Sequence, residues 1–536
     1  MRKRHFAGLS IFQILAQFRR GIFYFFLSIY LKEFLGVSNT EMTLFATLPM
    51  IANIAAQSGI WGRISDRFKK RRLLIILGES YAAIGYLIVY WIHLFLGTKF
   101  NITNLTYNLS HLSSYSIERN IGVNWLRVAA YTIIIGFTII EAGWSSSNLG
   151  WTTLIADLTR DSERSKTMGL LQFVGGIGNV LGVTASGFLY LNGLGFWNGY
   201  LFYISSGIMI FSIIAIFMIP ESYAQLDEDY FKEIDEKDKN KGIVRYEKAE
   251  NGKTQWPIKL FIWLLITLSI VNIGGNSINQ MIQIHIRLPD TFAASDIVVA
   301  QLRNTSSIAM IIAGLLIGYL TARFGDSKML LAGFSFIFIG TIALPFAPHI
   351  VIFFIYMALT GTSRVWIQTT TYSMVNRVIP LANRGKMMGY YNATFYLSWG
   401  LGGTIMTGPI ADALVSSNFG IIIFYIVILF IILGSILYLV VNKYVKFKSR
   451  GKTFFYSSIS LSMVFIAILS IFATKPIATL LINSGNTDSY AYKITFYVAA
   501  LLTAIGIIVY LFFRPYNFEL LSLDKDNKKS ELNSTN

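Results

Sequence analysis

The sequence predicts an all-α polytopic membrane protein with fourteen membrane-spanning helices. Of its 536 residues 54% are hydrophobic and only 14% are charged, whereas roughly 25% of the residues of a soluble domain are charged. Apolar runs of the length that crosses a bilayer as a helix, about 20 residues, recur along the whole chain. A short basic segment between two of these runs also has a degenerate copy in the other half of the chain.

A polar segment divides the apolar runs into two sets of six, followed by two more. This segment, 220–256, mixes acidic and basic residues and is typical of a cytoplasmic linker. We therefore predict an N-terminal six-helix half at 1–219, a C-terminal six-helix half at 257–442, two extra C-terminal helices within 443–513 and a polar cytoplasmic tail at 514–536. The expected spans are 7–31, 42–61, 73–96, 125–154, 167–191, 199–219, 258–286, 297–321, 328–347, 350–375, 387–411, 420–441, 454–473 and 494–513.

The basic segment at 62–72 indicates both topology and duplication. It contains six Lys or Arg residues and a single acid, Asp66, and positively charged loops stay on the cytoplasmic side of a membrane. Its copy lies at 318–328, and a second segment, 157–169, recurs at 377–389. Duplicated loops in the two halves of a polytopic protein are typical of transporters built from repeats.

The predicted topology places both termini in the cytoplasm and the loop 97–123 outside the cell membrane. That loop contains three acceptor patterns for N-glycosylation, at Asn101, Asn104 and Asn108. The alternative is a loop that is merely rich in Asn and Ser. Both interpretations agree with a multi-pass protein of the plasma membrane.

Composition argues against several other classes of protein. The net charge of +17 would suit a nucleic-acid partner, but the basic residues gather in short segments beside apolar runs, at 2–4, 63–72 and 443–452. Membrane topology explains that placement better. The chain has no cysteine and its five His residues are scattered, so we predict no disulfide, no metal site and no cofactor.

The duplicated segments resemble those of the major facilitator superfamily of secondary transporters, over roughly residues 6–442. The residues that follow its signature between helices 2 and 3 are Gly62, Ile64, Asp66, Arg67, Lys70 and Arg71, and 164–169 resembles its usual helix 4–5 connection. Two positions depart from the pattern: Lys69 replaces a glycine, and Ala322 stands where the second copy would carry its acid. The resemblance implies two halves that rock about a cavity lined by the first, fourth, seventh and tenth helices.

The resemblance also implies a latch at the cytoplasmic face. Asp66 would lie at a helix N-terminus of the other half, where the positive end of the helix dipole favours a carboxylate. Lys70 or Arg71 would pair with Asp157, and the latch would favour the outward-open state. The alternative is that these gating candidates, with Gly62 and Arg67, only fix topology.

Polar residues follow helical spacing along the four spans that would line the cavity. A charged side chain inside a span costs at least about 2.5–3.5 kcal/mol on insertion, so such side chains usually face the protein interior. The candidates for substrate binding or coupling are Gln17, Arg20, Tyr24, Glu141, Ser145, Asn276, Gln280, Arg364 and Gln368. Arg19 points about 100° away from Arg20 and is expected to pack between helices.

Glu141 has two open interpretations. A carboxylate at mid-membrane can take up a proton and couple transport to a proton gradient, or it can form a permanent pair with Arg20 or Arg364. The two arginines exceed Glu141 in charge, which favours an anionic or polyhydroxylated substrate. Trp144 and Trp366 would equally suit a sugar or an aromatic drug.

We therefore predict a secondary active transporter of a small solute, with an organic anion or a sugar as substrate and protons as a candidate coupling ion. The alternatives are a multidrug efflux antiporter, a polytopic membrane enzyme and a non-transporting sensor. An enzyme would need acids grouped at a membrane face. The acids expected outside, Glu118, Asp290, Asp296, Asp412 and Asp488, are not close to one another in sequence. We expect a protein that is not an enzyme and functions as a monomer, with the lipid bilayer and its solute as partners.

Overall fold

The computed structural model describes residues 3–68, 70–98, 125–158, 161–221, 258–378, 390–391, 394–395, 398–415 and 487–513. Within these ranges nine helices are long and apolar enough to cross a membrane. A tenth span results if Phe173–Leu189 and Leu191–Trp197, which are bent by 58°, act together. The protein is thus a multi-pass helical membrane protein. The spans predicted at 420–441 and 454–473 lie outside the described residues.

The first group of helices comes from residues 3–216. Its elements are α1 (Lys3–Ile29), η1 (Tyr30–Phe34), α2 (Asn39–Ala56), η2 (Gln57–Trp61), α3 (Gly62–Phe68), α4 (Arg71–Gly97), α6 (Trp125–Leu158), α7 (Asp161–Leu189), η3 (Leu191–Gly193), α8 (Leu194–Trp197) and α9 (Tyr200–Ile216). The second group comes from residues 258–513. Its elements are α11 (Ile258–Ser277), α12 (Asn279–His285), α13 (Asp296–Phe324), α14 (Asp326–Ala343), η5 (Leu344–Phe346), α15 (Val351–Val378), η7 (Gly403–Thr407), α17 (Gly408–Val415) and α20 (Thr487–Phe513).

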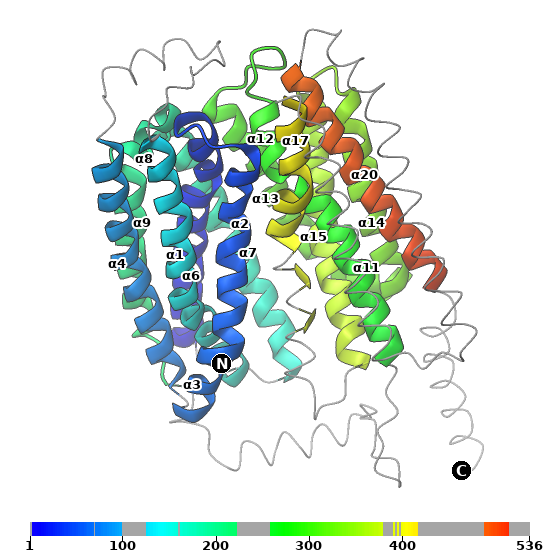
Figure 1. The fold of residues 1–536 in the computed structure, drawn as a ribbon. Helices are drawn as coiled ribbons and strands as arrows, with labels where there is room; N and C mark the ends of the chain where they lie inside the picture. The colour runs from blue at the N-terminus through cyan, green and yellow to red at the C-terminus, as the bar shows by residue number, and fades with distance from the viewer. Residues whose placement is uncertain are drawn as a thin grey trace, which may run out of the picture.

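The two groups lie side by side, with α1–α9 on one side of the bundle and α11–α20 on the other (Figure 1). In the first group α1 packs along α7 and α9, while α4 packs along α6 and α9. In the second group α11 packs along α20, and α14 packs along α15 and α20. The contacts of α20 with α11 and α14 therefore match those of α9 with α1 and α4.

Close packing of α1 on α7 depends on small residues. A Cβ atom on Gly178 would lie 2.3 Å from the carbonyl oxygen of Ile14, and one on Gly182 would lie 2.1 Å from that of Phe18. Glycines four residues apart lie on one helix face and allow two backbones to approach closely. This contact fixes the rotation of α1, and with it the directions in which its two central arginines point.

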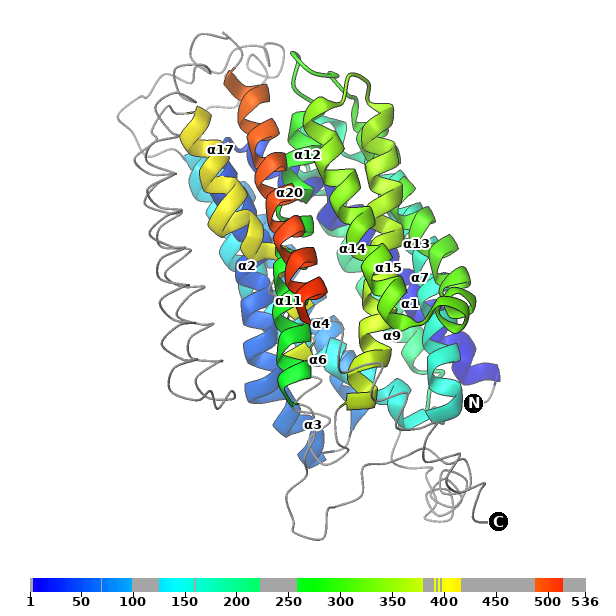
Figure 2. The ribbon, with the colours of Figure 1, turned by 90° about the vertical axis from the view of Figure 1, so that its right-hand side faces the viewer.

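The two groups are joined at one end of the bundle, which contains η1, α8 and α12 and which we call the closed end. In the part of the chain that the structure describes, the residue pairs that hydrogen-bond across the groups are Ser28–Gln283, Asn39–Asp412, Thr40–Asp412, Asn39–Tyr492, Thr47–Thr404, Asn179–Ser307, Thr184–Asn304, Asn192–Asp296 and Glu33–Arg287. Where the bonded residues of these pairs lie on helices, they lie in the half of the helix that is nearer the closed end. The N-terminus and α3 lie at the opposite end, and the tops of α17 and α20 lie at the closed end (Figures 1 and 2).

Candidate functional site

Glu141 lies in the middle of the first group and is held by neutral hydrogen-bond donors. Its side chain is buried, and its carboxylate accepts from the Tyr24 hydroxyl at 3.0 Å and from Asn53 Nδ2 at 2.9 Å. Among the described ion pairs, none joins Glu141 to Arg20 or Arg364. The permanent pair considered from the sequence is therefore not formed in this structure.

A chain of hydrogen bonds connects this carboxylate to a buried cation. Arg19 donates from Nη1 to the Tyr86 hydroxyl at 3.1 Å, Tyr86 donates to the Tyr24 hydroxyl at 3.0 Å, and Tyr24 donates to Glu141. Chains of this kind polarise one another in a medium of low dielectric constant. The charge of Arg19 thus supports the anionic form of Glu141 without touching it.

Trp144 contacts three charged side chains near the middle of the first group. The guanidinium carbon of Arg19 lies 4.4 Å from its ring centroid, and that of Arg20 lies 5.3 Å away. On its edge, Nε1 donates to Glu79 at 2.7 Å. Arg19 is 1% exposed whereas Arg20 is exposed. Two central cations are therefore balanced by two central carboxylates within this group.

Several predicted site residues instead contact their own helix or a neighbouring one. The Ser145 hydroxyl donates to the carbonyl of Ala142 at 2.7 Å, one turn earlier. A Cβ atom on Gly175 would lie 3.0 Å from Cγ of Gln17, so this side chain packs on α7. Gln280 lies beside η7, where its Oε1 is 3.3 Å from a Cβ placed on Gly403, and Gln368 is exposed.

In the second group the structure brings Arg364 together with Asn276. Arg364 Nη2 donates to Asn276 Oδ1 at 3.2 Å, and its guanidinium lies 5.4 Å from the ring centroid of Trp399. Arg303, on α13, is close enough for electrostatic repulsion with Arg364. The prediction from sequence missed Arg303 because it considered only spans expected to line a cavity.

The basic segment predicted to form a latch is described in part. Arg71 is buried and its Nη1 donates to the Ser65 hydroxyl, while Arg67 and Lys70 are exposed. A Cβ atom on Gly62 would lie 3.0 Å from the Gln57 carbonyl oxygen. The side chains of Asp66 and Asp157 lie outside the described residues, so the latch stays a prediction.

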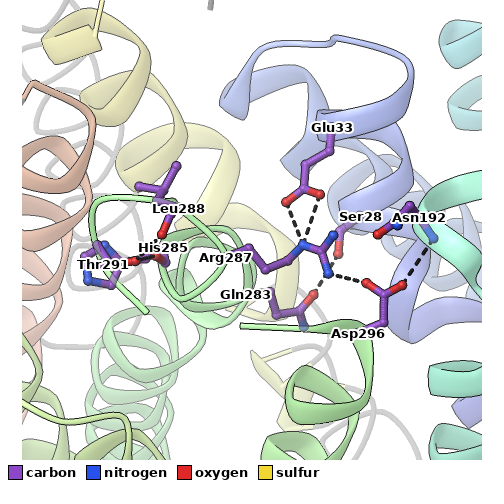
Figure 3. Close-up of polar contacts among 9 residues, drawn as sticks. All are labelled: Ser28, Glu33, Asn192, Gln283, His285, Arg287, Leu288, Thr291 and Asp296. Atoms are coloured by element: carbon purple, nitrogen blue, oxygen red, sulfur yellow. Dashed lines mark hydrogen bonds and ion pairs between the residues drawn. The ribbon is translucent and has the colours of Figure 1, made fainter. Parts of the chain in front are cut away.

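An ion-pair network that the sequence did not indicate crosses between the groups at the closed end (Figure 3). Arg287 Nε donates to both carboxylate oxygens of Glu33, at 2.9 and 3.0 Å, and its Nη1 pairs with Asp296. The second oxygen of Asp296 accepts from the backbone N–H of Asn192 at 3.1 Å. Ser28 donates to Gln283 at 3.1 Å beside this network. Arg287, which follows α12, therefore links η1 of the first group to the start of α13 in the second group.

The carboxylates hold Arg287 firmly in its charged form. Burial alone would lower the pKa of Arg287, but Glu33, Tyr190 and Asp296 raise it well above its ordinary value. No pH change in the physiological range can therefore neutralise this cation. Opening of the closed end has to break charged hydrogen bonds.

A second contact at the closed end places a carboxylate on a helix N-terminus. Asp412, on α17, accepts from the backbone N–H groups of Asn39 and Thr40 at 2.7 and 2.8 Å. These are free N–H groups of the first turn of α2, where the helix dipole favours a negative charge. The arrangement is the one that the sequence predicts for Asp66, but it lies at the other end of the bundle.

Comparisons with known proteins agree with this architecture. The family model of the Major Facilitator Superfamily matches residues 9–403 and 286–474. No curated protein matches the chain. The crystal structure of the nucleoside transporter NupG is similar over 96% of this chain and 100% of its own, with 11% identity and a TM-score of 0.58.

Two further structures show the same fold. A D-xylose–proton symporter is 15% identical over 75% of this chain and 89% of its own, with a TM-score of 0.54. A bacterial homologue of the iron transporter ferroportin, in an inward-facing state, is 12% identical over 96% of this chain and 99% of its own, with a TM-score of 0.51. The extent of the family match, together with the helical membrane fold, establishes that the chain belongs to the major facilitator superfamily of transporters.

Proposed function

We propose that the protein is a secondary active transporter that moves a small solute by alternating access, with Glu141 as its coupling residue. The observation that carries this proposal is a buried carboxylate bonded to Tyr24 and Asn53 rather than to a cation. Such a carboxylate can take up a proton without breaking an ion pair. Protonation would remove the charge that Tyr24 and Asn53 stabilise and would loosen α1 and α2 from α6.

The same proposal assigns a direction to the structure. The basic segment at 62–72 lies at the end opposite the Arg287 network, and basic loops remain in the cytoplasm. The closed end is then the outer side, and the structure corresponds to an inward-facing state. The Arg287–Glu33–Asp296 network and the Asp412 contact act as the outer gate.

We further propose that α20 completes the second six-helix half. It packs on α11 and α14 as α9 packs on α1 and α4, and Tyr492 on α20 donates to Asn39 across the groups. In this proposal the second half ends with α20 rather than at residue 442, in contrast to the boundaries predicted at 257–442 and 443–513. The spans predicted at 420–441 and 454–473 lie outside the described residues.

The named cargoes of the similar structures differ in chemistry, because they include a nucleoside, D-xylose and iron. They support transport of a small solute but do not select one. The decisive test is reconstitution of the full chain into liposomes with an imposed pH gradient. A solute that stabilises the purified protein should be accumulated when the gradient is present. If every stabilising solute fails to cross the membrane, the sensor interpretation replaces transport.

A further inference from the structure

We propose that Arg303 and Arg364 together bind the oxyanion group, a carboxylate or a phosphate, of the transported solute. This inference rests on the proposed transport function and names the chemical class of its substrate. It starts from a charge imbalance that is present in the sequence and that the structure localises.

The second group contains two partly buried cations, Arg303 and Arg364, in a part of the chain with few acids. Between Asp326 and Asp488 the sequence holds a single acid, Asp412, and there is none between Asp296 and Asp326 or in 258–289. The residues that the structure does not describe between 379 and 486 contain no acid either. Among the described ion pairs, none joins Arg303 or Arg364 to a carboxylate. Lys493, near the closed end over Tyr490, adds a further cation.

The two central acids of the first group, Glu141 and Glu79, are already engaged. Glu141 accepts from Tyr24 and Asn53, and Glu79 accepts from Trp144 Nε1 and the Ser147 hydroxyl, each at 2.7 Å. Arg19 and Arg20 lie over Trp144 and balance these two carboxylates. Neither of these two carboxylates is therefore available to Arg303 or Arg364, and an external anion is the counter-charge that we propose.

Asp412 cannot serve as the missing acid. Both of its carboxylate oxygens accept from the N-terminus of α2, at 2.7 and 2.8 Å. Releasing it would leave free N–H groups at a helix end that contacts another helix. Its place at the closed end also separates it from the central part of α15, where Arg364 lies.

Arg303 and Arg364 lie on neighbouring helices, α13 and α15, whose backbones approach closely where a Cβ atom on Gly361 would lie 2.2 Å from the Ser306 carbonyl oxygen. The two guanidinium groups repel each other electrostatically, and the Tyr356 side chain interacts with both. Arg364 is oriented by Asn276 and by the ring of Trp399. A guanidinium presents a planar fork of donors that matches carboxylate and phosphate oxygens. An oxyanion between the two forks would replace repulsion by two sets of charged hydrogen bonds.

The experiment measures thermal unfolding of the full chain, purified in a neutral detergent, with defined probes. Succinate, sulfate and glucose 6-phosphate are compared with glucose and with sodium chloride at equal ionic strength, and phosphatidylglycerol is added separately to detect a lipid phosphate. We expect at least one soluble oxyanion to raise the melting temperature in a saturable manner. Arg303→Gln and Arg364→Gln should each weaken that effect at least tenfold, whereas Arg323→Gln, which removes an exposed cation from the same helix as Arg303, should not.

The unliganded variants provide a second measurement. Because a partly buried cation beside a second cation is unfavourable, Arg303→Gln without ligand should melt at the same temperature as the parent protein or above it. If a glutamine variant fails to fold, Arg303→Lys keeps the charge but loses the fork, and it should bind the oxyanion more weakly than the parent does.

The outcomes separate this inference from the function on which it rests. Stabilisation by glucose alone, by phosphatidylglycerol alone, or equally in the parent and both glutamine variants would overturn the solute-oxyanion site and leave transport intact. Oxyanion binding that depends on both arginines, without counterflow of that anion in liposomes, would overturn transport and leave the binding site intact.

Discussion

Arg287 and Glu33 are 254 residues apart in sequence, yet they form a two-fold contact in which Arg287 Nε donates to both carboxylate oxygens at 2.9 and 3.0 Å. Glu33 belongs to η1 of the first group and Arg287 follows α12 of the second. Their side chains are 20% and 11% exposed, so water screens the contact only in part. The pair is the central ionic link that holds the closed end together, and it has to separate when that end opens.

Arg287→Gln should shift the protein towards the state that is open at this end. Hydrogen bonds to charged groups contribute about 1.5–3 kcal/mol each, and about 1.4 kcal/mol changes an equilibrium tenfold. Because the chain has no cysteine, Ser28→Cys provides a single reporter beside the network. A membrane-impermeant maleimide added from outside should label it at least ten times faster in the Arg287→Gln background.

The matched control for this experiment is Arg127→Gln. Arg127 pairs with Glu41 at the same end of the bundle, but both residues belong to the first group. Its loss should leave the labelling rate within about twofold of the parent rate. Equal rates in all three proteins would show that the Arg287 network does not control opening.

Asp412→Ala should weaken the second contact at the closed end. A carboxylate at a helix N-terminus contributes about 0.3–1 kcal/mol, and up to about 2 kcal/mol when partly buried. We expect a several-fold increase in the same labelling rate, with a smaller increase for Asp412→Asn because its amide oxygen still accepts one bond from α2. If both variants have the same effect, the hydrogen bond that Asn retains contributes nothing, and the effect comes from the lost charge.

Glu141→Gln should abolish accumulation driven by a pH gradient and leave solute exchange intact. The glutamine retains the shape and the oxygen that accepts from Tyr24, but it cannot bind or release a proton. Uptake and counterflow are measured in parallel in liposomes. Asp290→Asn, at an exposed position between α12 and α13, should retain both activities. Unchanged gradient-driven uptake in Glu141→Gln would remove Glu141 from the coupling step.

Arg20→Ala should weaken solute binding without unfolding the protein. Arg20 is exposed beside Trp144, whereas Arg19 is buried and donates to Tyr86. Loss of a charged donor costs about 1.5–3 kcal/mol, which corresponds to roughly a tenfold or greater increase in Kd. Calorimetric titration of the reconstituted protein with the best stabilising solute measures it. An unchanged Kd would assign Arg20 a structural role.

Gly182→Val should destabilise the contact between α1 and α7. A Cβ atom there would lie 2.1 Å from the Phe18 carbonyl oxygen, so the backbones have to separate. Overpacking of this kind costs about 1–3 kcal/mol and should lower the melting temperature. Gly207→Val on α9, where a Cβ meets no atom within 4 Å, is the control. If both variants melt at the same temperature, close approach at Gly182 is not required.

Local sequence patterns predicted the membrane helices well. The spans expected at 73–96 and 328–347 correspond to α4 (Arg71–Gly97) and to α14 with η5, which ends at Phe346, because a bilayer imposes one length and one polarity on every span. The spans expected at 167–191 and 199–219 end and begin close to the 58° bend after Leu189, but the short helices η3 and α8 between them were not predicted. Hydropathy reports burial in lipid and not the direction of the chain.

The contacts of the candidate site residues depend on tertiary packing, and their roles stay predictions. Glu141 and Tyr24, both candidates from the sequence, are hydrogen-bonded to each other, but Asn53 on α2 was missed because helix 2 was not expected to line the centre. Ser145 follows the predicted polar stripe, yet its hydroxyl donates to its own helix. Helical spacing identifies the face on which a side chain lies, whereas the neighbouring helix decides what that side chain contacts.

The sequence by itself determined the class of protein, the repeated loops and the excess of cations over acids after residue 296. These properties depend on composition and on short-range order, which the bilayer converts directly into helices and topology. Only the tertiary structure decided that Arg287 reaches Glu33, that Asp412 reaches the start of α2 and that α20 packs against α11. Such contacts join segments hundreds of residues apart, and their partners are selected by how whole helices pack rather than by any pattern along the chain.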